Sequence, residues 1–160
     1  MKGFSSAILQ ALLLTSMLTV TFSVQPAWAW ETIYISADGS IWPEGAPITT
    51  SDNITYTLTG DIIAEMIWIQ RSSIIVDGNG RTLRGLGSGY GFYWSGCWNV
   101  TIKNTNIQYS RYGVFAHRSC LSTVVGNNIT NNSWYGVYLF VSSNCSVSGT
   151  LINAVFDGKA

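Results

Sequence analysis

Beyond the first thirty residues, apolar and polar residues alternate in short runs that are separated by Gly, Asn and Ser. Alternation with a period of two predicts short β-strands joined by tight turns. No window in this part of the chain shows the 3.6-residue period of an amphipathic helix. The pattern therefore predicts an all-β protein.

The strand pattern repeats along the chain. The segments Tyr90–Trp94, Tyr112–Ala116 and Tyr135–Leu139 align at offsets of 22 and 23 residues. A second block follows each copy, at 101–107, 123–129 and, more loosely, 146–152. A repeat of this length with several short strands predicts one coil of a parallel β-helix, whose coils stack at a spacing of about 4.8 Å. A leucine-rich horseshoe is the alternative solenoid, but its L-x-x-L-x-L pattern is missing.

Residues at equivalent positions of successive coils should stack on one another inside the helix. Alternation within each strand predicts which side chains point inward. The predicted inward columns are Phe92/Val114/Val137, Trp94/Ala116/Leu139, Ile102/Val124/Val147 and Ile107/Ile129/Ile152.

The chain divides into three parts. Residues 1–29 carry Lys2, an apolar stretch from Ala7 to Val24 and a small-x-small site that ends at Ala29. This combination is typical of a secretory signal peptide cleaved between Ala29 and Trp30. It predicts a secreted or cell-surface protein with no membrane span after signal removal. An uncleaved membrane anchor is the alternative, because the apolar stretch is long for a signal.

Residues 30–72 do not repeat and are predicted to form an N-terminal β cap, with strands at 32–36, 54–58 and 66–70. A solenoid needs such a cap because its first coil would otherwise expose a strand edge. Residues 73–160 are predicted to form the coils. No cap is visible after the last coil, so we expect either a truncated chain or self-association through the uncovered C-terminal coil.

The charge of the chain is unusually low. Eight basic and eight acidic residues amount to 10% of the sequence, against about 25% in ordinary domains. The absence of a basic stripe argues against nucleic-acid binding. Stacked coils bring like positions within about 5 Å, where like charges repel and neutral polar side chains do not. Asn106 and Asn128 are predicted to form such a polar ladder.

Three segments carry a family resemblance: residues 33–41, 56–62 and 75–80, with sequences IYISADGSI, YTLTGDI and IVDGNG. They resemble the N-terminal part of secreted archaeal NosD-like proteins, which are also described as periplasmic copper-binding and belong with the pectin-lyase-like folds. The resemblance covers nearly all of the chain after residue 30. It implies a right-handed, single-stranded parallel β-helix and, for function, copper delivery. Members usually have more coils, so this chain is short for the family.

Candidate catalytic and metal-binding residues are few. Polysaccharide lyases, hydrolases and epimerases need acid–base groups gathered on one face, yet no Asp or Glu lies between Tyr90 and Phe156. Asp77 lies in a D-G-N-G turn, where backbone geometry explains it. Copper sites need clustered His, Cys or Met, and only His117, Cys97 and Cys120 come near such a set. We therefore expect no catalytic residue, no metal and no cofactor.

Two surface features remain as candidate sites. Outward alternation aligns the aromatic residues Tyr93, Phe115 and Tyr138, with Phe140 beside them, as a platform for sugar rings or as a purely structural ladder. Five N-x-S/T sequons predict N-glycosylation at exposed turns. These are Asn53, Asn99, Asn128, Asn131 and Asn144.

The sequence thus predicts a β-helix module with a structural, adhesive or glycan-binding role, whose partners would be polysaccharide or other components of the cell envelope. One alternative is the N-terminal fragment of a carbohydrate-active enzyme. The other is a copper-delivery accessory protein. The three cysteines leave one unpaired even where disulfides form.

Overall fold

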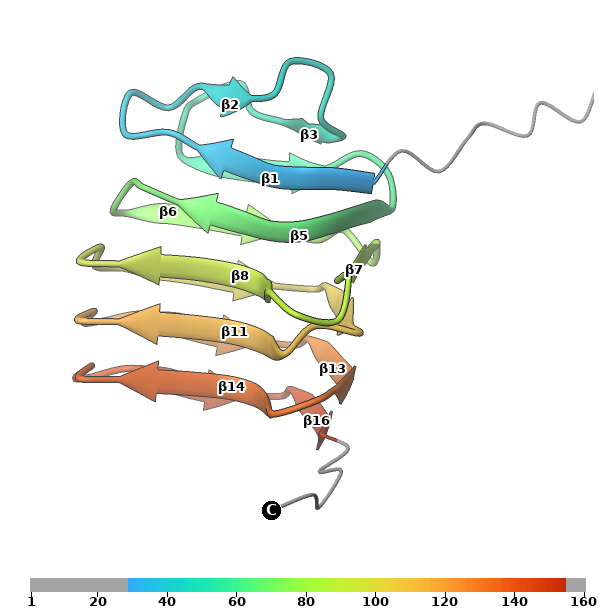
Figure 1. Ribbon diagram of the computed structural model, residues 1–160. Helices are drawn as coiled ribbons and strands as arrows, with labels where there is room; N and C mark the ends of the chain where they lie inside the picture. Colours follow the sequence, from blue (N-terminus) through green and yellow to red (C-terminus); the bar gives the residue numbers. More distant parts are fainter. Residues whose placement is uncertain (1–28, 155–160) are drawn as a thin grey trace, which may run out of the picture.

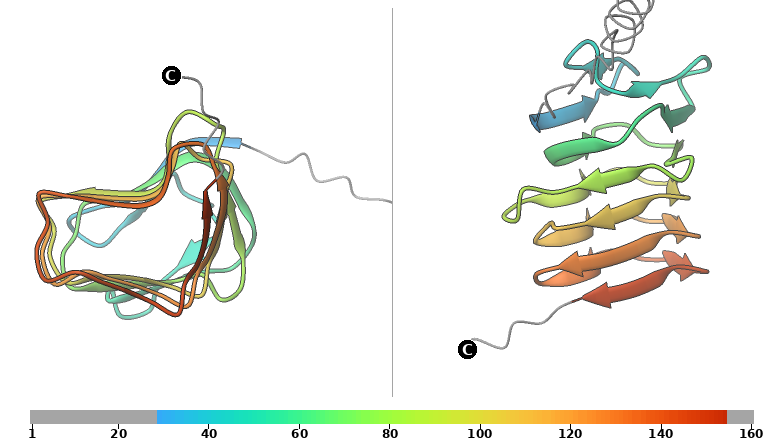
Figure 2. Two further views of the ribbon diagram at one scale, coloured as in Figure 1. Left: turned by 90° about the horizontal axis from the view of Figure 1, so that it is seen from below. Right: turned by 90° about the vertical axis from the view of Figure 1, so that its right-hand side faces the viewer.

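The computed structural model describes residues 29–154, which fold into sixteen strands and no helix. The strands wind into a single stack of coils, and Figure 1 shows the coils lying one above another along the axis. Seen from below, the coils superpose into one outline (Figure 2). Within the described residues no helix is present that could cross a membrane.

Each coil contributes strands to three faces of the stack. The first face carries β1 (Ala29–Ile35), β5 (Ile62–Ile69), β8 (Tyr90–Ser95), β11 (Tyr112–His117) and β14 (Tyr135–Phe140). The second face carries β4 (Thr55–Leu58), β6 (Ile74–Asp77), β9 (Val100–Lys103), β12 (Thr123–Val125) and β15 (Ser146–Ser148). The third face carries β7 (Thr82–Arg84), β10 (Asn106–Gln108), β13 (Asn128–Asn132) and β16 (Leu151–Ala154).

All strands of these three faces pair in parallel with the equivalent strand of the next coil. The long strand β5 links two faces. Its start pairs with β7 through Ile62 and Ile63, whereas its end pairs with β8 through residues 67–69. The parallel β-helix predicted from the sequence is confirmed.

Two short strands break the parallel order at the N-terminal end. β2 (Ile41–Trp42) pairs antiparallel with β1, and β3 (Ile48–Thr49) pairs antiparallel with β4. Both lie at the top of the stack in Figure 1. The segment predicted as a cap thus contains antiparallel strands, but it also continues the parallel ladder through β1 and β5. The predicted signal peptide falls outside the described residues except for Ala29, which begins β1.

The core is the apolar interior of the coils. All four predicted inward columns have the predicted register. Their members in the coils of β8 and β11 are fully buried, and Trp94 and Phe92 are among the largest buried side chains. In the last described coil Val147 and Ile152 remain 41% and 44% exposed, because no described coil lies below them. Burial of a column member therefore depends on a neighbour on each side.

A glycine column explains the Tyr-Gly pair that opens each repeat. A Cβ atom on Gly91 would lie 2.6 Å from Cγ2 of Ile107, and one on Gly113 would lie 2.6 Å from the carbonyl oxygen of Gly136. Real Cβ atoms do not approach so closely, so only glycine fits. Both Gly91 and its neighbour Phe92 are buried, which interrupts strict alternation. Tyr90 consequently lies on the same outer surface as Tyr93.

Buried asparagines tie successive coils together. The Oδ1 atom of Asn127 accepts from the backbone N–H of Thr105 at 3.0 Å, and its Nδ2 donates to the carbonyl of Ile102 at 2.9 Å. Asn132 makes the same pair of bonds with Ser110 and Ile107. Each amide thereby satisfies main-chain groups that the turn leaves unpaired, as a buried polar group must.

Candidate functional site

An outward column of aromatic rings runs the length of the first face. Register partners from β1, β5, β8, β11 and β14 place one ring in each coil. The ring centroids are 5.4–5.7 Å apart at each step. The column consists of Tyr34, Trp68, Tyr93, Phe115 and Tyr138. The structure thus brings together the three column residues predicted from the sequence and adds Tyr34 and Trp68.

A second aromatic column lies beside the first. Tyr90, Tyr112 and Tyr135 stack with centroids 5.3 and 5.8 Å apart and with planes 21° and 14° apart. These tyrosines also contact the first column, because Tyr112 lies 5.3 Å from Phe115. The sequence argument missed this column because strict alternation from Tyr93 would point Tyr90 inward. The signal that could have found it was the glycine that follows each of these tyrosines.

A shorter third column completes the surface. The ring of His117 stacks on Phe140 at 5.4 Å, and Phe140 also lies 5.9 Å from Tyr138. His117 Nδ1 is 3.1 Å from the hydroxyl of Ser95 in the coil above. We call the outer surface formed by these three columns on β1, β5, β8, β11 and β14 the aromatic face. All four predicted glycan-facing residues belong to it.

The aromatic face offers ring edges and hydroxyl groups rather than open ring faces. Where neighbouring rings are nearly parallel, as in the second column, each covers a face of the next. Among tyrosines of the described chain, Tyr56 alone has its hydroxyl bonded to protein, to the carbonyl of Gly39 at 2.9 Å. The five tyrosine hydroxyls of the columns below Trp68 therefore have no protein partner in the described residues. Burial raises the pKa of Tyr112, and the neighbouring tyrosines add to this shift.

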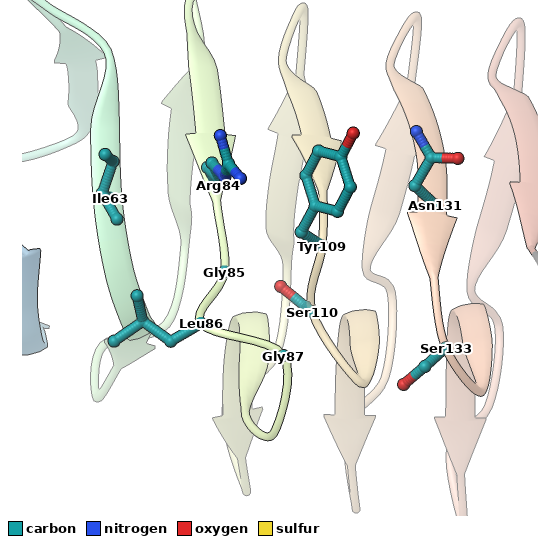
Figure 3. A pocket seen from close by; sticks show the side chains of 9 residues that line it. All are labelled: Ile63, Arg84, Gly85, Leu86, Gly87, Tyr109, Ser110, Asn131 and Ser133. Carbon is teal, nitrogen blue, oxygen red and sulfur yellow. The ribbon is translucent and has the colours of Figure 1, made fainter.

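A groove of about 570 Å³ lies near the start of these strands (Figure 3). Arg84, Tyr109 and Asn131 line it from three successive coils, and Ile63 and Leu86 are its aliphatic side chains. The guanidinium carbon of Arg84 lies 4.7 Å from the centroid of the Tyr109 ring. Sequence analysis did not predict this groove, because it depends on which turns stack on which.

An arginine and a tryptophan border the second column. The guanidinium carbon of Arg111 lies 3.3 Å from the ring centroid of Trp134, a typical cation–π contact. Trp134 in turn packs edge-on against Tyr112 at 5.7 Å. The Arg111 guanidinium thus contacts an aromatic ring rather than a carboxylate. Its N–H groups can therefore donate hydrogen bonds to a polar ligand.

All five sequon asparagines are exposed. Four of them adopt the left-handed backbone conformation, with φ between 51° and 56°: Asn53, Asn99, Asn131 and Asn144. Asparagine tolerates this conformation better than most residues. The backbone conformation alone therefore explains asparagine at these four positions, whether or not they are glycosylated. Asn128 and Asn131 lie in β13 rather than in a turn, contrary to the expectation that all five occupy turns. Asn128 donates to Oδ1 of Asn106 at 3.4 Å, which confirms the asparagine ladder. Glycosylation stays a prediction.

Asp77 is held as an ionised turn residue. Its Oδ1 accepts from the backbone N–H of Asn79 at 2.9 Å, and its Oδ2 lies 3.0 Å from Nζ of Lys103. Partial burial opposes ionisation, but the bonds from Asn79, Lys103 and Asn104 outweigh it and lower the pKa of Asp77. A lowered pKa suits a structural anion, whereas a general acid needs a raised one.

The candidate copper ligands do not gather. The buried thiol of Cys97 contacts the carbonyl oxygens of Ile69 and Ser95, whereas Cys120 pairs through its backbone with Trp98 and Ser143. Across the described residues, no group of three or more His, Cys, Asp or Glu side chains is placed to hold a metal ion. Burial raises the pKa of the Cys97 thiol, so it is held as the neutral thiol. All three cysteines are unpaired.

A single-chain stack of parallel coils with strands on three faces defines a parallel β-helix protein. The family described as the right handed beta helix region matches residues 45–158. The chain belongs to this family. Neither a curated protein nor a solved structure matches the chain.

Proposed function

We propose that this chain is a secreted or cell-surface β-helix module that binds uncharged polysaccharide through its aromatic face and does not cleave it. The observation that carries the proposal is the aromatic face itself. It presents stacked rings and five tyrosine hydroxyls that make no hydrogen bond to described protein groups. Its role would be structural or adhesive, at the cell envelope.

The chemistry of the aromatic face fits a polymer rich in hydroxyl groups. Tyrosine combines an apolar ring with a polar tip, which suits a ligand that has both C–H and O–H groups. The columns contain no Asp, Glu, Lys or Arg side chain, so binding of an uncharged ligand removes no such charged group of the columns from water. The coils repeat the same side chains at the strand spacing of about 4.8 Å, which favours a repeating chain over a single sugar. Tyr135 and Phe140 are exposed and the other rings of the aromatic face are partly exposed, and a contiguous aromatic surface that reaches solvent often marks a binding site.

Secretion and glycosylation rest on the sequence and on exposure. Residues 1–29 have the pattern of a signal peptide, and all five sequon asparagines are exposed. These observations support an extracellular location. Sugars at these turns would lie away from the first face, because the asparagines belong to turns and to β13.

Two alternatives remain proposals of lower rank. A carbohydrate-active enzyme would need acid–base groups, and the segment from Tyr90 to Phe156 supplies no carboxylate. If the chain is part of a longer enzyme, added coils would have to supply them. Copper delivery follows from the family resemblance alone. A titration with Cu(I) and Cu(II) that detects tight binding would favour it.

The proposal can be tested by pull-down with insoluble and soluble polysaccharides, both uncharged and acidic. Replacing Tyr93 and Tyr138 together by Phe removes two hydroxyls and keeps both rings in the column. We expect binding of an uncharged polysaccharide to fall about tenfold, because two hydrogen bonds are lost, while Tm stays unchanged.

Tyr109→Phe is the matched control, since Tyr109 lies in the groove and not on the aromatic face. It should bind as the unmodified protein does. The proposal fails if no polysaccharide binds, or if the double variant binds as well as its parent. Release of reducing sugar or of an unsaturated product would favour the enzyme alternative.

A further inference from the structure

The turns that follow β8, β11 and β14 form a row at one edge of the stack, visible at the left of Figure 1. They span residues 96–99, 118–121 and 141–144, and we call this row the turn edge. Backbone bonds link the turns in order, from Gly96 to His117 and from Arg118 to Phe140. Because successive turns stack, the outward side chains of all three turns meet the same side of the solvent.

The turn edge carries large apolar side chains where turns usually carry polar ones. Trp98 is 54% exposed, Leu121 is 54% exposed and Val141 is 67% exposed. The position of Leu121 is held by Asn99 and Asn144 in the adjacent turns, and the position of Val141 by Gly96 and Arg118. The position of Trp98 is held by Cys120 and Ser143. A single exposed apolar residue needs no explanation, but here three consecutive turns each carry one on the same edge of the stack.

Two of these residues also occupy an unfavourable backbone conformation. Leu121 has φ of 58° and Val141 has φ of 51°, in the left-handed region that disfavours bulky and β-branched residues. Glycine or asparagine would relieve the backbone strain and would expose no large apolar side chain to water. The fold therefore does not need Leu121 or Val141 at these positions. Strain that the fold itself does not require points to a function of the side chains.

We propose that the turn edge is a docking surface for an anionic lipid membrane, with Trp98, Leu121 and Val141 entering the interface. The turns project from the stack, so their side chains can insert into a fluid lipid surface without a complementary pocket in the partner. Tryptophan favours the membrane–water interface, aliphatic side chains bury in the acyl region just below it, and arginine keeps its charged head among the headgroups. This inference is independent of polysaccharide binding, which uses a different face. It requires that the sequons at Asn99 and Asn144, which lie on the turn edge, carry no sugar.

The charges of the turn edge support an anionic partner. Arg118 is exposed within it, and Arg71 lies in the preceding turn, where its Nη1 donates to the carbonyl of Ala37 at 3.2 Å. No carboxylate occurs from Tyr90 to Phe156. Asp38 lies near Arg71 at the N-terminal end of the stack, away from the three apolar turns. Cations close to a lipid surface strengthen binding to anionic headgroups.

The test uses the protein secreted from a host that attaches no N-glycans, with its N-terminus read by mass spectrometry, and vesicles of phosphatidylglycerol and phosphatidylcholine. Such a host is needed because Leu121→Asn, Val141→Asn and Leu86→Asn each create an N-x-S/T sequon. Flotation measures the bound fraction. Replacing Leu121 and Val141 together by Asn should lower vesicle binding about tenfold. The same double variant should have a higher Tm than its parent, because backbone strain is relieved. A loss of binding with a gain of stability cannot come from misfolding.

Leu86→Asn is the matched control, because Leu86 is 50% exposed in the groove and outside the turn edge. Its vesicle binding should equal that of the parent. Arg118→Asn should weaken binding to anionic vesicles at low salt and leave binding to pure phosphatidylcholine unchanged. The inference is overturned if the parent does not float with vesicles, or if Leu86→Asn loses as much binding as the double variant. It is also overturned if light scattering shows a dimer that the double variant abolishes, since the partner would then be a second copy.

Discussion

The ring of Tyr112 lies 5.8 Å from the ring of Tyr135, and the two planes differ by only 14°. The two residues are register partners in the parallel pair β11–β14, so the spacing of the coils sets the spacing of the rings. Each ring in such a column covers part of its neighbour. The same contacts that present tyrosine hydroxyls to a ligand therefore also hold the coils together.

Phe115 lies at the centre of this arrangement and tests its contribution to stability. Its ring contacts Tyr93 at 5.7 Å and Tyr138 at 5.4 Å. It also contacts Tyr90 at 5.2 Å and Tyr112 at 5.3 Å. Replacing Phe115 by Ala should lower the free energy of unfolding by about 1–3 kcal/mol, because all four aromatic pairs are lost. Urea unfolding measures the change. A variant that unfolds at the parent's urea concentration would show that the columns do not stabilise the stack.

Gly113→Ala should be strongly destabilising. The added methyl group would lie 2.6 Å from the carbonyl oxygen of Gly136 and 2.6 Å from Cγ2 of Ile129. Neither neighbour is a flexible side-chain tip, so we expect a loss of about 2–4 kcal/mol in urea unfolding. Gly60→Ala is the control, since its nearest atom would be Cβ of Pro47 at 3.5 Å. Equal stability of the two variants would contradict the close packing at the Tyr-Gly corner.

Asn132→Ala should cost more than Asn128→Ala. Removing the Asn132 amide leaves the N–H of Ser110 and the carbonyl of Ile107 unpaired inside the stack. A loss of about 2–4 kcal/mol is expected, because two buried groups lose their partner. Asn128 is exposed and makes one long bond of 3.4 Å, so its removal should change stability by no more than about 0.5 kcal/mol. The reverse order would show that the buried amides are not the links between coils.

The ion pair of Asp77 predicts a dependence of stability on pH. Because its pKa is lowered in the folded protein, Asp77 adds stability that is fully present above the ordinary carboxyl value of about 3.9. That stability is lost as pH falls from this value through the lowered one. Asp77→Asn should therefore be less stable than the parent at neutral pH, and the two should converge in acid. A constant difference at all pH values would exclude this linkage.

Cleavage between Ala29 and Trp30 predicts a mature chain that begins at Trp30. Intact-mass measurement of the secreted protein, before and after enzymatic removal of N-glycans, checks both the cleavage site and the sequons. We expect the mass after glycan removal to match a chain without residues 1–29. A mass that still includes these residues would favour the membrane-anchor alternative.

The repeat made most of the fold predictable. Equivalent positions of a parallel β-helix must stack, so an offset of 22 or 23 residues was enough to predict the columns of Phe92 and Val114 or Ile107 and Ile129. The N-terminal part was harder. Tyr34 and Trp68 join the aromatic column through the pairing of β1, β5 and β8. The sequence around them has no recognisable repeat from which this pairing could be predicted. Where two segments differ in sequence, only the pairing itself fixes which residues are neighbours.

The sequence by itself determined the fold class, the register of the repeated coils, the low charge and four residues of the aromatic face. These are local or periodic properties, and stacking carries them directly into space. The tertiary structure decided the rest: the second tyrosine column beside Gly91 and Gly113, the groove at Arg84, and the row of strained apolar turns at Leu121 and Val141. Each of these three features depends on where the chain departs from strict alternation and on which residues of the adjacent coil lie beside it. The repeat period alone does not give either piece of information.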